Sequence, residues 1–314
     1  RCRVAQRCIH DSSMTCCGLT ARIPRQCKDG RMGGVGAVRI LTVGRVQVRP
    51  KNIAGSGTPM LWWTFTSREW SAVLPVHAFV IEHSLGTLLW DTGPAPASAE
   101  PGYFPGGLVG AIYRRQVRSL VADDETLDAQ LALAGVPTTS IALAAISHLH
   151  YDHAGNVASL GAVPILVSEA EHALLGEKSP HMHGVLTEHV APAGADFTPV
   201  AFTATDDPAL AAFGASHDIH GDGTLVLLPT PGHSAGSMSL LVRRGDGRAP
   251  LLLVGDVTYD PALMDAGVVP DVGDRAVQLE TAGRIRALRE ALPGLVVLAA
   301  HDPNAATLLA AAGA

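Results

Sequence analysis

Residues 147–156 of the chain are SHLHYDHAGN, a run in which four metal-competent side chains stand within six positions. Imidazole and carboxylate groups are ligands that zinc and the neighbouring transition metals accept. The apolar run 141–146 just before it predicts a buried strand, so the four side chains would lie on a loop at its C-terminal end. His148 and His150 point the same way in extended backbone, whereas Asp152-His153 stands where a helix can begin and can serve a second site. This stretch therefore predicts a metal centre.

Three later apolar segments also end in a residue of ligand type. A Pro-Gly turn after one predicted strand carries His233, a second strand ends in Asp256, and a third ends in His301. Any one of them alone is an ordinary polar residue at a strand end. Four such segments in one chain favour a shared centre that can hold two metal ions with positions left for water and substrate. The candidate ligands are His148, His150, Asp152, His153, His233, Asp256 and His301.

The order of these motifs resembles that of the metallo-β-lactamase superfamily. H-x-H-x-D-H is followed by T-P-G-H, by G-D and by a late A-H, and the resemblance covers most of residues 38–305. The run GTLLWDTG at 86–93 is similar to the early strand and Asp-Thr-Gly of that superfamily. Segments 147–156, 256–259 and 300–302 resemble the N-acyl-homoserine lactonases. The resemblance implies an α/β fold, a four-layer αβ/βα sandwich of two mixed β-sheets with outer helices.

The same resemblance implies how the ligands divide between two divalent ions. Zinc is the expected metal, and cobalt, manganese and iron also suit this donor set. Asp256 would bridge the two ions. His148, His150 and His233 would hold one ion, and Asp152, His153 and His301 would hold the other.

The resemblance also implies catalytic roles for Asp152, Asp256 and Tyr259, and a supporting role for Asp91. A hydroxide that bridges the metals would open the lactone ring of an N-acyl-homoserine lactone, a quorum-quenching reaction, while Tyr259 donates a hydrogen bond to the substrate carbonyl or its oxyanion. Asp152 could pass a proton to the leaving alkoxide, and Asp91 would fix the tautomer of a ligand histidine. The sequence has no cysteine after Cys27, which argues against a covalent acyl-enzyme formed on a cysteine.

Other functions are compatible with the same donors. An organophosphate triesterase, an arylesterase or a thioesterase such as a hydroxyacylglutathione hydrolase remains open, and so do an iron-dependent oxidoreductase and a non-catalytic metal-binding scaffold. A β-lactamase is disfavoured, because those enzymes typically lack the residues matched here by Asp256 and His301. Flavodiiron centres resemble H-x-E-x-D, and the histidine at position 150 argues against them.

Aromatic residues make up only 4% of the chain, and they gather in two stretches that predict a wall of the substrate pocket. Three of the four tryptophans lie within 62–70, and a Tyr-Phe pair precedes the Pro-Gly-Gly at 105–107. A hydrophobic edge or dimer contact, or a loop before a helix, would explain these stretches equally well. His181 and His183 are expected at the surface or the pocket rim. The predicted pocket residues are Trp62, Trp63, Phe65, Trp70, Tyr103 and Phe104.

The composition fits a compact enzyme with a small-molecule lactone or ester substrate. The chain has 314 residues, of which 47% are hydrophobic, and can bury a large core. A net charge of −6 gives no cationic surface for nucleic acid, and no apolar run of about eighteen residues or more predicts a membrane span, so neither nucleic acid nor membrane is an expected partner. A homodimer is compatible with the sequence. Helices are expected at 125–134 and 281–292.

Residues 1–31 differ from the rest. They hold all five cysteines and carry seven basic against two acidic side chains, a net +5, which leaves −11 for residues 32–314. They show no apolar periodicity and no signal-peptide core, so we expect a disordered or non-native leader with translation beginning at Met32. The predicted hydrolase domain is 32–314, and the predicted location is the cytoplasm.

Overall fold

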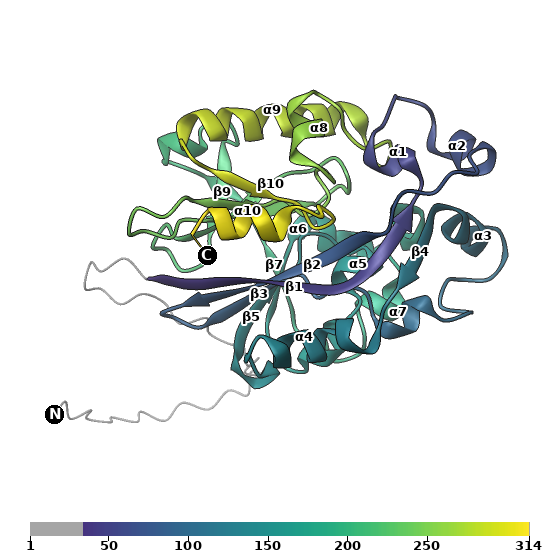
Figure 1. Ribbon diagram of the computed structural model, residues 1–314, viewed down its shortest axis with the longest axis horizontal. Coiled ribbons are helices and arrows are strands. Elements are labelled where there is room, and N and C mark those ends of the chain that lie inside the picture. Colours follow the sequence, from purple (N-terminus) through teal and green to yellow (C-terminus); the bar gives the residue numbers. More distant parts are fainter. Residues whose placement is uncertain (1–33, 314) are drawn as a thin grey trace, which may run out of the picture.

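The computed structural model describes residues 34–313, which form two mixed β-sheets packed between outer helices (Figure 1). The expected leader at 1–31 lies outside the described residues. The arrangement is the four-layer αβ/βα sandwich that the family resemblance implies. Among the described helices, none is long and apolar enough to cross a lipid bilayer.

The first sheet mixes antiparallel and parallel pairs and has seven strands. Their spatial order is β4 (Val117–Leu120), β1 (Val35–Val48), β2 (Leu74–His83), β3 (Thr87–Trp90), β5 (Ile141–Ala145), β6 (Ile165–Ser168) and β7 (Phe197–Val200). The pairs among β4, β1, β2 and β3 are antiparallel, and those among β3, β5, β6 and β7 are parallel.

The second sheet has six strands, and its neighbours are antiparallel except for one parallel pair, which is formed by the last two strands in the sequence. Their spatial order is β13 (Val296–Leu298), β12 (Leu251–Leu253), β11 (Met238–Val242), β10 (Leu225–Pro229), β9 (Ala215–Asp218) and β8 (Thr203–Ala204). The parallel partners β12 and β13 therefore end at the same edge.

Helices cover the outer faces and the ends of the sandwich. They are α1 (Pro50–Ile53), α2 (Met60–Thr66), α3 (Gly107–Gln116), α4 (Leu127–Leu133), α5 (Tyr151–Ala154), α6 (Glu169–Ala173), α7 (Thr187–Val190), α8 (Pro261–Asp265), α9 (Arg275–Ala291) and α10 (Ala305–Ala311). Figure 1 shows α8 and α9 outside the second sheet and α4 outside the first.

Strand alternation divides the apolar side chains among three buried cores. On β2, Phe79 and Ile81 enter the core between the sheets, whereas Val80 faces the core beneath α4. On β10, Leu227 enters the core between the sheets and Leu228 faces the core beneath α8 and α9. Each central strand is therefore apolar on both faces, as expected for a sheet covered on both sides.

Both predicted helices form, with different bounds. The helix expected at 125–134 begins at Leu127, because the Thr126 side chain accepts a hydrogen bond from Ala129 N and caps it. The helix expected at 281–292 begins earlier, at Arg275, because the Asp274 carboxylate caps two backbone amides there. Side-chain caps, rather than apolar periodicity, decide where these helices start.

Candidate metal centre

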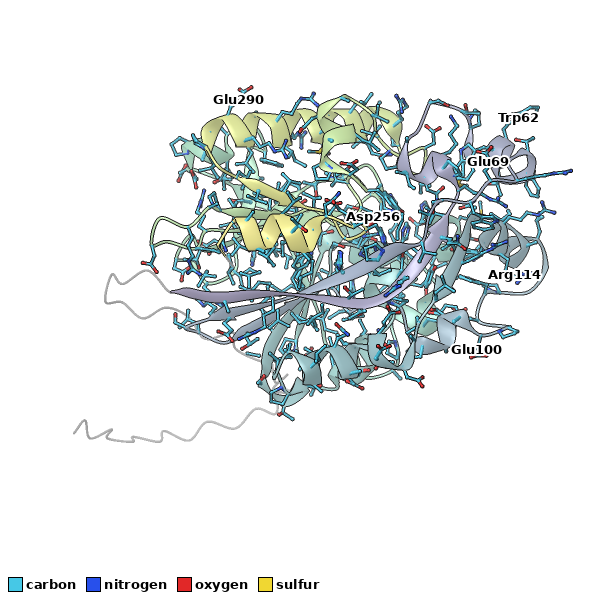
Figure 2. The ribbon with its side chains drawn as sticks, in the orientation of Figure 1. Trp62, Glu69, Glu100, Arg114, Asp256 and Glu290 are labelled. Carbon is cyan, nitrogen blue, oxygen red and sulfur yellow. The ribbon has the colours of Figure 1, made fainter. Side chains whose placement is uncertain are left out.

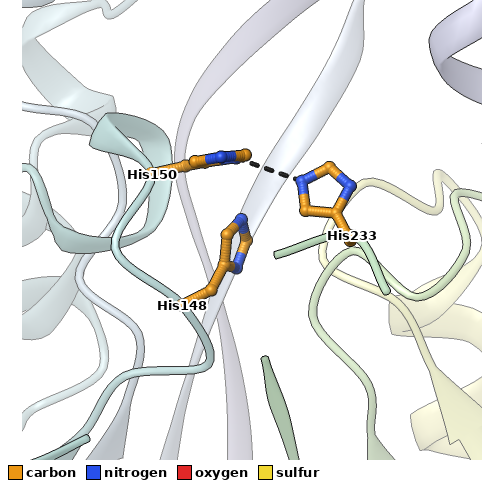
Figure 3. Close-up of side chains that lie close together, drawn as sticks. All are labelled: His148, His150 and His233. Carbon is orange, nitrogen blue, oxygen red and sulfur yellow. Dashed lines mark hydrogen bonds between the residues drawn. The ribbon is translucent and has the colours of Figure 1, made fainter. Parts of the chain in front are cut away.

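All seven predicted ligand side chains lie together where the loops after the strands meet. They form three overlapping groups, and within each group the ligand atoms lie within 4.8 Å of one another. Figure 3 shows the first group, in which His150 Nδ1 lies 3.0 Å from His233 Nε2. The groups are His148 with His150 and His233, then His148 with His153 and Asp256, and finally Asp152 with His153 and His301.

Asp256 lies among the rings and presents a different oxygen to different histidines. Its Oδ1 is 3.1 Å from His153 Nε2 and 3.2 Å from His301 Nε2, while its Oδ2 is 3.4 Å from His233 Nε2. A carboxylate in this position can hold two cations at once. The placement fits the bridging role that the resemblance implies.

The donor atoms are suited to cations rather than to one another. The atoms His148 Nε2, His153 Nε2, His301 Nε2 and Asp256 Oδ1 are buried and have no hydrogen-bond partner of normal geometry among the described residues. Buried polar atoms are almost always satisfied in folded proteins, so this cluster of unpaired acceptors fits a bound cation. Neutral imidazoles around a carboxylate are a suitable set for a divalent metal ion.

Asp91 orients two of the candidate ligand rings through their Nδ1 atoms, one directly and one through Ser147. Its Oδ2 accepts a hydrogen bond from His153 Nδ1 at 3.0 Å and another from Ser147 Oγ at 2.9 Å. Because that hydroxyl donates to Asp91, it accepts from His148 Nδ1, which lies 3.1 Å away. Both histidines therefore expose a lone pair on Nε2 toward the centre. Asp91 does this from a left-handed backbone with φ 58°, an uncommon conformation outside glycine.

Backbone carbonyl groups orient two more rings. His150 Nε2 donates to the carbonyl oxygen of His183 at 3.1 Å, so this ring offers Nδ1 to the centre, and His301 Nδ1 donates to the carbonyl oxygen of Pro75 at 2.9 Å. Gly184 permits the first contact, because a Cβ there would lie 2.1 Å from His150 Nε2. The sequence placed His183 at the rim and gave no sign that its backbone oxygen orients a ligand.

The electrostatics of the centre oppose protonation of some rings and favour it on others. Burial lowers the pKa of His148 well below its usual value and lowers the pKa of His233 to about 3. Burial also disfavours the charge on His153 and His301, but the Asp256 carboxylate outweighs it and raises the pKa of both rings. The Asp256 carboxylate therefore favours the protonated form of these two rings.

Metal binding is therefore expected to release protons near neutral pH. A metal ion must displace the protons on His153 and His301, so affinity should rise with pH until their raised pKa values are passed. Zinc titration of metal-free protein in buffers of different ionisation enthalpy measures the number of protons released. Asp256→Asn removes the carboxylate that raises both pKa values and should release fewer protons. Equal proton release from both proteins would contradict this assignment.

The centre lies at the floor of a cavity of about 920 Å³. His150, Asp152, His233, Asp256 and Tyr259 contribute polar atoms to it. The lining also includes a set of apolar and aromatic side chains, which are Val48, Met60, Ile112, Tyr113, Val117 and Met182. Such a cavity, apolar with a few convergent polar groups, is typical of a small-molecule site.

None of the four aromatic residues predicted for the pocket from the first stretch lines this cavity. Trp62 is 67% exposed and lies at the periphery, far from Asp256 (Figure 2). Helix α2 turns Met60 toward the cavity, and one turn further on it buries Trp63 and exposes Phe65. Trp70 lies between two guanidinium groups, those of Arg49 and Arg118, at 3.9 and 4.0 Å from its ring centroid.

The second stretch lies one layer behind the wall. Tyr103 is buried and stacks on His189 with 3.8 Å between ring centroids, and Phe104 packs on Tyr113 and Tyr151 at 5.3 Å from each. Tyr113 and Tyr151 line the cavity, so Tyr103 and Phe104 support the wall without forming it. Both aromatic stretches therefore lie outside the cavity lining, the first at its periphery and the second behind it.

Tyr259 reaches the centre as the motif suggested. Its hydroxyl donates to Asp256 Oδ2 at 3.2 Å, and its ring stacks on His301 with 4.8 Å between centroids. Burial, together with the nearby carboxylates of Asp256 and Asp152, raises the pKa of this phenol well above its usual value. Tyr259 therefore keeps its proton at neutral pH and remains a hydrogen-bond donor.

Known proteins share this architecture and part of the sequence. The family model described as "Metallo-beta-lactamase superfamily" matches residues 72–301. An N-acyl homoserine lactonase, AttM, of Azorhizobium caulinodans is 28% identical over 74% of this chain and 83% of its own length, and AttM of Agrobacterium fabrum is 29% identical over the same shares. A solved N-acyl homoserine lactone hydrolase with N-hexanoyl-L-homoserine at its catalytic metal centre superposes with TM-score 0.68 at 21% identity, covering 87% of this chain and 96% of that one.

Proposed function

Since the chain belongs to the metallo-β-lactamase superfamily, we propose that it hydrolyses the ring ester of N-acyl-homoserine lactones and so acts in quorum quenching. The observation that carries the proposal is the position of Tyr259, a protonated donor beside Asp256 at the floor of a cavity with an apolar wall. The AttM relatives bear the name of that activity. An N-acyl lactone has the matching parts, a polar ring and an apolar chain.

The donor set favours two divalent ions, with zinc as the expected metal. His148, His150 and His233 would hold one ion, Asp152, His153 and His301 the other, and Asp256 both. When bound, such ions lower the pKa of water toward about 7 and polarise a carbonyl oxygen. The histidine orientations set by Asp91, His183 and Pro75 favour this arrangement before any ion arrives.

The chain's own groups supply the remaining steps of ester hydrolysis. The Tyr259 hydroxyl donates toward the carbonyl oxygen as negative charge grows there. One oxygen of Asp152 lies 3.5 Å from His301 Nε2 and faces the cavity, where it can carry a proton from the attacking water to the leaving ring oxygen. The carbonyl carbon gains a hydroxyl, the ring C–O bond breaks, and an N-acyl-homoserine is released.

A substrate panel tests this function. Zinc-loaded protein should release protons from hexanoyl- and dodecanoyl-homoserine lactone with a kcat/KM at least about 10²-fold above that for paraoxon or a glutathione thioester. The same protein stripped of metal serves as the control. A higher kcat/KM for paraoxon or the thioester would assign the cavity to a triesterase or a thioesterase instead.

A further inference from the structure

Glu171 is a fully buried carboxylate that contacts two ligand-bearing loops at once. It lies on α6, and none of its surface is exposed. One oxygen, Oε1, accepts a hydrogen bond from Leu149 N at 2.8 Å. The other, Oε2, accepts from Ser234 Oγ at 2.6 Å and from Gly236 N at 3.0 Å. Glu171 is not one of the grouped metal donors, so its place in the centre is indirect.

We propose that Glu171 is a positioning residue that sets the spacing of the triad His148, His150 and His233. Leu149 lies between the two histidines of the first loop, and Ser234 directly follows His233 in the second. One carboxylate thus ties the backbone of one loop to the other, at the place where His150 and His233 approach to 3.0 Å. The proposal deepens the proposed function, because it concerns the same centre.

The N-terminus of α6 makes a second contact with the His233 loop, and this keeps the carboxylate in place. Ser168 Oγ accepts from Glu171 N at 3.0 Å and donates to the carbonyl oxygen of Gly236 at 2.6 Å. A Cβ on Gly236 would lie only 2.1 Å from Glu171 N. Only glycine fits such a close approach. The Ser168 hydroxyl and the Glu171 carboxylate therefore both hold the loop at Gly236 against the start of α6.

The negative charge of Glu171, like its hydrogen bonds, favours a cation at the triad. Its three donors are two backbone amides and one hydroxyl, so no positive charge is among them. A buried carboxylate is costly when only neutral groups surround it. A cation at three neutral histidines supplies the opposite charge, and the two should therefore stabilise each other. In contrast, Asp91 contacts the His153 ring directly and reaches the His148 ring through the Ser147 hydroxyl, so its loss should affect both predicted sites.

The test compares Glu171→Gln in two variants that each keep one site. His301→Ala keeps the triad of His148, His150 and His233, whereas His150→Ala keeps the group of Asp152, His153 and His301. Zinc affinity is measured by competition with a chromophoric chelator. Glu171→Gln should weaken binding by about 10- to 100-fold in the His301→Ala protein and leave it unchanged in the His150→Ala protein. Equal losses in both proteins, or none in either, would overturn the proposal.

Two further variants keep the result interpretable. Glu169→Gln makes the same chemical change two residues away on α6, at an exposed position, and should leave zinc affinity unchanged in both proteins. Ser234→Ala removes one of the three donors and should cause a smaller loss confined to the triad. It carries the test if Glu171→Gln does not fold. Metal affinity is the readout throughout, so a failure here is distinct from a failure to hydrolyse lactones.

Discussion

Asp256→Ala is expected to reduce lactone hydrolysis to the background rate and to lower the metal content of the protein. The change removes a carboxylate whose two oxygens contact different histidines. Oδ1 lies near His153 and His301, and Oδ2 lies near His233; among the described residues, no other carboxylate contacts all three rings. Without it, no described side chain can join the two ligand groups. Metal analysis after desalting, together with the proton-release assay on hexanoyl-homoserine lactone, measures both effects.

The matched control is Asp260→Asn, four residues further along the same segment. Asp260 caps α8 by accepting from Ala262 N, and asparagine caps a helix equally well. This variant should keep wild-type metal content and turnover. Full activity of Asp256→Ala, with both ions retained, would remove the bridging role and the mechanism built on it.

The grouping of the seven candidate ligands was predictable because its signal is local in sequence. H-x-H-x-D-H specifies four donors within six positions, and each remaining ligand follows an apolar strand that the sequence also marks. Strands β3 and β5, and likewise β12 and β13, run parallel, so their following residues meet at one edge. Within each sheet, such a shared edge brings residues distant in sequence together: Asp91 meets Ser147, and Asp256 meets His301.

The supporting contacts carried no such signal. Glu171 appears in the sequence as an ordinary glutamate near the start of a short helix, and only the fold shows it fully buried between two loops. The orientation of His150 depends on the backbone oxygen of His183, which no side-chain pattern encodes. The sequence did not identify the residues that line the cavity for a related reason. A cluster of aromatic residues does not show which face of α2 turns toward the cavity.

Tyr259 combines two features that can be separated by one substitution. Its ring stacks on His301 and so supports a ligand, while its hydroxyl points to Asp256 Oδ2 in the cavity. Phenylalanine keeps the stacking and removes only the donor. The hydroxyl stays protonated at neutral pH because burial and two carboxylates raise its pKa. Its contribution to turnover should therefore be that of a neutral hydrogen-bond donor.

Tyr259→Phe is accordingly expected to lower kcat by up to about 10²–10³-fold while both metal ions and the KM stay close to those of the wild type. The reason is that the lost hydrogen bond strengthens only as charge develops on the carbonyl oxygen, after the substrate has bound. Tyr113→Phe is the matched control, because that tyrosine lines the same cavity but donates to the carbonyl oxygen of His181. It should leave kcat largely intact. If Tyr259→Phe turns over as fast as the wild type, the hydroxyl serves only to hold Asp256, and the oxyanion must be stabilised by other groups.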